Sequence, residues 1–242
     1  MERHELSHTS GLEMNFEQRI LKQKFRDPLS LFLSVGTTPF FLIFFHSLID
    51  RETQISFGRL ALGILVFSII LLVFSAGLLF RQELDNGLHS LYRLLGINSS
   101  RILFGFYGVS LAEGFVSFGI SSIFVLIFSP GELQIGINQI LGVFLCISFC
   151  LFLGFWIAIL TQSPLQTFFV SSSIMFLLLL FSGILFPMPK IKVFSYLPTA
   201  LVHSLLLEPK SNLTHLGFLA LESLTIALVV FIHFDFKRKS LL

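Results

Sequence analysis

Hydrophobic residues are concentrated in six long runs along the chain, and short polar segments separate these runs. The runs cover approximately Leu29–Ile49, Phe57–Phe80, Ile102–Phe128, Ile137–Leu160, Leu165–Phe186 and Leu213–Phe234. Each run is close to the ~20 apolar residues that a helix needs to cross the hydrocarbon core of a bilayer. A spanning segment must satisfy its own backbone hydrogen bonds, so the pattern predicts an all-α membrane protein with six transmembrane helices within residues 29–236.

The connection between the fifth and sixth runs is ambiguous. Val193–Leu207 is nearly all apolar, but it is short for a crossing, and Pro198 removes a backbone donor near its middle. We therefore expect two re-entrant half-helices that dip into the membrane from its outer face, and not a seventh span.

The segment between the second and third runs is charged and helix-like. It covers Arg81–Gly105 and reads RQELDNGLHSLYRLLGINSSRILFG. A segment of this composition must lie in water beside the membrane, and we expect a short helix there.

The composition agrees with a membrane protein. Of the 242 residues, 54% are hydrophobic and 12% are charged, which excludes an ordinary soluble globular domain. Too little sequence lies outside the apolar runs to build a separate soluble domain. The sequence also has no G-x-x-x-x-G-K-[ST] phosphate loop, so we expect this chain not to be an enzyme and any ATP-driven engine to be another chain.

The basic residues predict the orientation, because lysine and arginine accumulate on the cytoplasmic side of short loops. They cluster in three regions: Arg19, Lys22, Lys24 and Arg26 before the first run, Arg81, Arg93 and Arg101 after the second, and Lys237–Lys239 at the end. An even number of spans brings all three regions to one side. We therefore expect both termini in the cytoplasm, with a tail of residues 1–28 and a basic tail of residues 237–242.

Residues before the first run fit two interpretations. Arg19, Lys22 and Arg26 share one helical face, which is typical of a helix that lies in the membrane interface with its basic side toward lipid phosphates. The alternative is a solvated basic approach to the first span.

Two carboxylates lie deep inside apolar runs. Glu113 and Glu222 are each about a dozen residues inside a predicted span, where an ionised side chain is costly by roughly 3 kcal/mol. Such a group faces a bundle interior, a partner or an aqueous path. One hypothesis is contact with the substrate or a proton, and the other is a protonated carboxyl that bonds a neighbouring side chain.

The sequence offers little for a metal. Cys146 and Cys150 lie in an apolar run at helical spacing, where thiols act as small hydrophobes. His4–His8 formally matches the H-E-x-x-H zinc pattern, but it lies in a polar tail without the buried helix and third ligand that zinc requires. We expect no metal site and no cofactor on this chain.

The segment after the second run carries a family-like motif. Type 2 ATP-binding-cassette exporter permeases have E-x-x-x-G-T-L-E-x-L-L-x-[ST]-P there, followed by I-L-x-G. Without a gap, Glu83, Gly87 and Ile102–Gly105 fit this pattern, and Leu91 and Leu94 lie close to its leucine positions, whereas Leu88, Ser90 and Gly96 depart from it. Phe181–Pro187 and Tyr196–Thr199 resemble the F-S-G-x-x-F-P … Y-L-N-P-L signature of the same family. The chain after residue 15 therefore resembles these permeases.

This resemblance implies a half-transporter in a bacterial or archaeal plasma membrane. Its partners would be two ATPase subunits that bind ATP and Mg, a second copy of itself or a related permease, and the bilayer, but no nucleic acid. The segment after the second span would be a cytoplasmic coupling helix, with leucines toward the membrane domain. The residues implied for coupling are Glu83, Asp85, Gly87, His89 and Arg93, those for an outer gate are Pro187, Tyr196 and Pro198, and those for the translocation path or bundle interior are Glu113 and Glu222.

The cargo is less defined than the class. Many Phe and Leu and few intramembrane charges favour a hydrophobic or amphipathic substrate, such as a drug, a peptide or a lipid. A polysaccharide or lipid-linked glycan export permease is the alternative, and a haem-export-type permease is a third. From other classes, the chain could be a membrane scaffold that an ATPase drives without transport, or an intramembrane metalloenzyme.

Overall fold

The computed structural model describes residues 36–48, 57–87, 99–128, 133, 135–182, 192–207 and 213–240, and all its regular elements are helical. These are α3 (Thr37–Leu48), α4 (Phe57–Asp85), α6 (Ser99–Phe128), α7 (Ile137–Leu160), α8 (Pro164–Phe181), the 3-10 helix η2 (Lys192–Tyr196), α9 (Pro198–Leu207) and α10 (Leu213–Ser240). The prediction of an all-α protein is confirmed for the described part of the chain. The tail and interfacial helix predicted within residues 1–28 lie outside it.

Five described helices are long and apolar enough to cross a membrane. These candidate spans are Leu60–Asp85, Ser100–Phe128, Ile137–Leu160, Pro164–Phe181 and Leu213–Phe234. They correspond to five of the six predicted runs. Of the first run, Leu29–Ile49, the structure describes its second part, which forms α3, so the sixth span stays a prediction.

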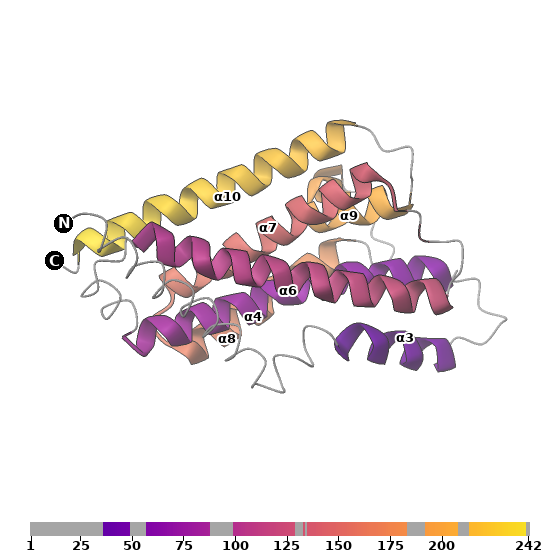
Figure 1. Cartoon of the computed structure of the whole chain (residues 1–242), viewed down its shortest axis with the longest axis horizontal. Coiled ribbons are helices and arrows are strands. Elements are labelled where there is room, and N and C mark those ends of the chain that lie inside the picture. The colour runs from indigo at the N-terminus through magenta and orange to yellow at the C-terminus, as the bar shows by residue number, and fades with distance from the viewer. Residues whose placement is uncertain are drawn as a thin grey trace, which may run out of the picture.

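α4 and α7 form the centre of the helix bundle, and the other helices surround them (Figure 1). In the most apolar stretch of each span, 72% of residues are buried in α4 and in α7, but 28% in α6, 17% in α8 and 22% in α10. The outer helices therefore leave most of their residues incompletely buried by the protein. In a membrane, lipid can cover such faces, so they need no protein partner.

The helix boundaries differ from those predicted by apolar length. α4 does not end at Phe80 but continues through Asp85, and α6 already begins at Ser99. Arg81–Asp85 is therefore helical and continuous with the second span, because helix formation depends on backbone hydrogen bonds and not on apolar composition. Residues 88–98, the rest of the predicted coupling helix, lie outside the described ranges.

Residues 192–207 form two short helices, η2 and α9, that meet at Pro198. α9 packs where α7 and α10 begin. The side-chain amide of Gln139 donates to the carbonyl of Leu205 over 3.4 Å, and Ser204 lies 3.5 Å from Nδ1 of His215. Because α9 contacts the beginnings of both helices, it lies at one end of the bundle (Figure 1). A re-entrant arrangement from the outer face stays a prediction.

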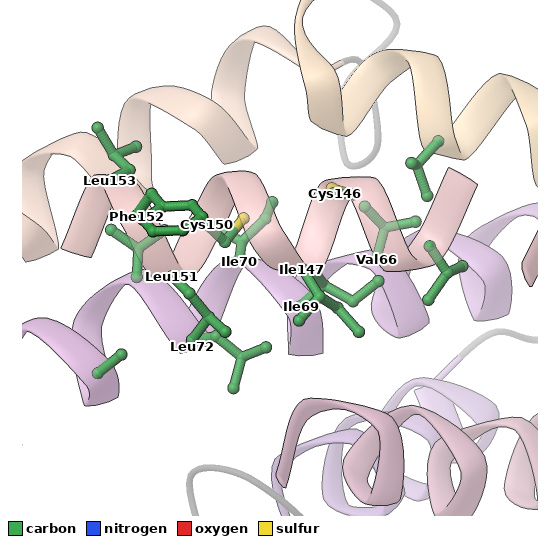
Figure 2. Close-up of a cluster of buried hydrophobic side chains, with 14 of the residues drawn as sticks. Val66, Ile69, Ile70, Leu72, Cys146, Ile147, Cys150, Leu151, Phe152 and Leu153 are labelled. Atoms are coloured by element: carbon green, nitrogen blue, oxygen red, sulfur yellow. The ribbon is translucent and has the colours of Figure 1, made fainter. Parts of the chain in front are cut away.

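α4 and α7 approach each other so closely that their backbones touch. A Cβ atom on Gly154 would lie 2.5 Å from the carbonyl oxygen of Val73, and one on Gly77 would lie 2.8 Å from the carbonyl oxygen of Gly154. Larger side chains fill the space on either side of this contact, and Figure 2 shows part of this cluster, including Val66, Ile69, Ile70, Leu72, Cys146, Ile147, Cys150, Leu151, Phe152 and Leu153. Close approach through small residues is a common mode of helix packing in membranes.

We predict that Gly154→Ala destabilises the bundle. The added methyl group overlaps backbone atoms that cannot move aside as a side chain would, and overpacking of this kind costs about 1–3 kcal/mol. Thermal unfolding in detergent measures the effect.

Gly119→Ala is the matched control, because a Cβ atom at Gly119 meets nothing within 4 Å. The same change there should be neutral or slightly stabilising, since alanine favours a helix. Equal melting temperatures of the two variants would contradict the proposed backbone contact.

Candidate functional site

The end of α4 is where the predicted coupling residues begin. The amide of Asn86 donates to the carbonyl of Gln82 over 2.9 Å, and the amide of Gly87 donates to that of Leu84 over 3.3 Å. Gly87 has φ of 71°, a left-handed conformation that ends many helices and favours glycine. This geometry explains why a glycine stands at this position of the motif.

Glu83 and Asp85 both lie in the last turns of α4. The Glu83 side chain is only 5% exposed and therefore faces the protein. Asp85 accepts a charge-assisted hydrogen bond from Nη2 of Arg81, one helical turn earlier. The predicted contact of these two residues with an ATPase stays a prediction, and His89 and Arg93 lie outside the described part of the chain.

The short turn between α7 and α8 lies beside this end of α4. Thr161 shares a hydrogen bond of 2.6 Å with Thr167, and the Ser163 side chain accepts from the amide of Gln166 over 3.3 Å. The Gln166 side chain in turn accepts from the amide of Gln162 over 2.9 Å. These bonds cap α8 at its first residue and hold the turn in one conformation.

Arg81 joins α4 to this turn. Its Nη1 donates to the carbonyls of Thr161 over 2.8 Å and Ala158 over 3.4 Å, and its Nη2 donates to that of Gln162 over 3.0 Å. The Ala158 carbonyl lies in the last turn of α7, and those of Thr161 and Gln162 follow directly after it. At such a helix end the dipole is negative and backbone acceptors lack partners within the helix. A guanidinium group with its several donors suits such a site.

Glu113 and Glu222 occupy different parts of the bundle, Glu113 in α6 and Glu222 in α10. Both side chains are half-buried. One carboxylate oxygen of Glu222 is buried and has no hydrogen-bond partner among the described residues. The next residue, Ser223, donates to the Leu145 carbonyl of α7 over 2.8 Å, so this part of α10 faces α7.

The structure describes two of the three residues predicted for an outer gate, Tyr196 and Pro198. Tyr196, at the end of η2, is 49% exposed, and its ring centroid lies 5.0 Å from that of Phe218 in α10. Pro198 is buried at the first position of α9, where a missing backbone donor costs nothing. Pro187 lies outside the described residues. The gate assignment of these residues stays a prediction.

The described ranges contain no group of three or more His, Cys, Asp or Glu side chains that could hold a metal ion. Cys146 and Cys150 are buried free thiols in the contact between α7 and its neighbours. Their packing role follows directly from this burial.

The described helices thus form a bundle in which five are long and apolar enough to cross a membrane, and hydrogen bonds of Arg81 join the end of α4 to the turn between α7 and α8. A protein-family model described as "ABC-2 type transporter" matches residues 16–204, which is most of the chain. The chain therefore belongs to the ABC-2 type transporter family and is a permease subunit of an ABC transporter that works with an ABC ATPase subunit. No curated protein and no solved structure matched it significantly.

Sequence reasoning did not identify Arg81 as a site residue, because it entered only as a positive charge that orients the membrane protein. Its partners are backbone carbonyls on a helix that follows almost eighty residues later. Every residue has a backbone carbonyl, so the residue types do not indicate which carbonyls accept a hydrogen bond from a side chain. The one available signal was the position of Arg81 directly after the apolar run.

We predict that Glu222→Leu raises the melting temperature in detergent. The change removes a buried carboxylate oxygen without a described partner, a cost of roughly 3 kcal/mol if the group is charged. In a chain of this size 1 kcal/mol corresponds to about 2–4 °C. Glu222→Gln keeps the polar shape and should raise the melting temperature less. A drop in melting temperature for both variants would mean that the carboxylate is satisfied and stabilising.

Proposed function

We propose that this chain is the membrane subunit of an exporter that moves a hydrophobic or amphipathic substrate outward while separate subunits hydrolyse ATP. The observation that carries this proposal is the family match over residues 16–204, which covers the described helices from α3 to α8 together with η2 and most of α9. ATP and Mg would bind the partner, and this chain would carry neither catalytic residues nor a cofactor. Two permease chains and two ATPase subunits would form the transporter.

The arrangement of the helices supports one orientation. The end of α4, the beginning of α6 and the end of α10 lie at the same end of the bundle (Figure 1). The basic residues Arg81 and Arg101 lie at this end, and Lys237–Lys239 follow in the last turns of α10. By the positive-inside rule, this end is the cytoplasmic one and receives the ATPase. Both termini are then cytoplasmic, in the plasma membrane of a bacterium or archaeon.

The chemistry of the spans supports an apolar cargo. The faces of α6, α8 and α10 carry exposed Phe, Leu, Ile and Val side chains, and these helices contain few charged groups at membrane depth. A glycan would need more polar groups along its path, although a lipid-linked glycan could present its lipid part. Glycan export is therefore the second candidate, haem export is a third, and a scaffold driven by the ATPase without transport is the alternative of another class.

Purification of the tagged chain from its native membrane tests the partnership. We expect an ATPase with a phosphate loop to copurify in equal amounts. The complex, reconstituted into vesicles, should move a fluorescent short-chain phospholipid or a lipophilic dye when ATP is supplied. A complex whose ATPase lacks its catalytic glutamate is the control. Movement of a lipid-linked glycan alone would favour the second candidate, and ATP hydrolysis without movement of any probe would favour the scaffold.

We predict that Arg93→Glu lowers ATP-driven transport at least about tenfold, within the roughly 5- to 150-fold range of coupling between sites. The change reverses a charge in the segment that connects α4 to α6 and should weaken docking of the ATPase. Membrane insertion and the melting temperature of the permease should stay unchanged. Full transport and full stimulation of the ATPase by this variant would contradict a coupling role of the segment.

A further inference from the structure

We propose that Arg81 is a positioning residue that fastens the end of α4 to the turn between α7 and α8, so that both move as one body. The inference rests on the proposed function, because the force to be transmitted comes from an ATPase. On this basis a displacement of the segment after α4 reaches three spans, α4, α7 and α8, and not α4 alone.

The contacts of the guanidinium carry this inference. Arg81 is 12% exposed, and its two terminal nitrogens reach the Asp85 carboxylate and three carbonyls, one in the last turn of α7 and two in the turn that follows. Bonds from several donors of one planar group to several acceptors fix both distance and orientation. A single point charge such as lysine cannot reproduce this geometry.

The location of Arg81 adds a second argument. It lies one helical turn after Gly77, and Ala158 lies one turn after Gly154. The closest backbone contact of α4 and α7 is therefore followed at once by the arginine bridge. Apolar packing and hydrogen bonds together prevent the two helix ends from sliding or rotating independently.

The turn can pass the displacement on because it is itself rigid. Thr161 and Thr167 are both buried, and their shared hydrogen bond joins the end of α7 to the first turns of α8. The cap of Ser163 and the bond from the Gln162 amide to the Gln166 side chain close the same turn. A movement imposed on the Thr161 carbonyl is therefore imposed on α8.

Asp85 takes a different role from the one that the family resemblance implied. Its carboxylate holds the guanidinium from the solvent side and is itself 32% exposed. It orients Arg81 toward the α7 carbonyls and needs no direct contact with the ATPase. Asp85→Asn should therefore lower the amount of substrate transported per ATP, but by less than loss of the Arg81 guanidinium does.

The first test measures substrate transported per ATP hydrolysed, with the fluorescent phospholipid as probe and the complete complex in vesicles. We expect Arg81→Gln to lower this ratio about tenfold while ATP hydrolysis changes less than about twofold. Arg81→Lys should give an intermediate ratio. Thr225→Ala, at an exposed position whose hydroxyl donates to the Leu221 carbonyl of its own helix, should leave the ratio unchanged. An unchanged ratio in Arg81→Gln with a lower melting temperature would overturn the proposal, because Arg81 would then only stabilise the fold.

The second test measures the distance between spin labels at Gln82→Cys and Gln162→Cys, two exposed positions on either side of the bridge, with Cys146 and Cys150 replaced by alanine. We expect a narrow distribution that is the same without nucleotide and with trapped ATP. In Arg81→Gln it should broaden or shift with ATP. A distance that changes with ATP in the unaltered bridge, or an equally narrow one without Arg81, would overturn the proposal.

The two tests separate this inference from the proposed function. If the permease with Arg81 intact binds no ATPase and moves no probe, the proposed function fails. The width of the label distribution in the permease alone then decides whether the bridge holds α4 to the turn, and a width insensitive to Arg81→Gln rejects it.

Discussion

The bundle depends on the backbone contact between α4 and α7 at Gly77 and Gly154. In a membrane, lipid tails are as apolar as leucine, so burial of apolar side chains alone does not drive helices together. Helices must instead gain close packing, and the absence of two side chains lets the α4 and α7 backbones meet. Large buried side chains of the same two helices then pack together along their length, and Figure 2 shows part of this cluster. α6, α8 and α10 pack against a pair whose distance is already fixed.

Hydroxyl groups are tolerated in this apolar bundle because many bond to their own helix. Ser68, Ser122, Ser148, Ser173 and Thr225 each donate to the carbonyl three or four residues earlier. Such bonds need no partner helix and so place no demand on tertiary structure. An ionised carboxylate has no proton to donate, so Glu113 and Glu222 can use this solution only when they are protonated. This difference makes the two carboxylates stronger candidates for function than the many buried hydroxyls.

The sequence predicts features that depend on local residue types, such as spans and helix breaks, but not contacts between segments far apart along the chain. Runs of apolar residues placed five candidate spans correctly, and Pro198 correctly marked the break between η2 and α9. Apolar length placed the end of the second span at Phe80, because hydropathy cannot detect a helix that continues into polar residues. The Arg81 bridge and the Gly77–Gly154 contact join segments far apart in sequence. The presence of an arginine or a glycine does not indicate which distant segment it contacts, so a single sequence could not predict these contacts.

The two ends of the bundle differ in the strength of the hydrogen bonds that join their helices. At the end of α4, directional hydrogen bonds from Arg81 and within the α7–α8 turn fix the helices relative to one another. At the opposite end the hydrogen bonds between helices are longer, 3.4 Å from Gln139 to the Leu205 carbonyl and 3.5 Å between Ser204 and His215. Aromatic pairs join η2 to its neighbours there, with ring centroids 4.3 Å apart for Phe181 and Phe194 and 5.0 Å apart for Tyr196 and Phe218. Apolar aromatic contacts depend less on exact geometry than bonds between charged and polar groups do. Under the proposed export function, a force applied at the rigid end would therefore be relieved at the aromatic end, which is where an outward opening would have to form.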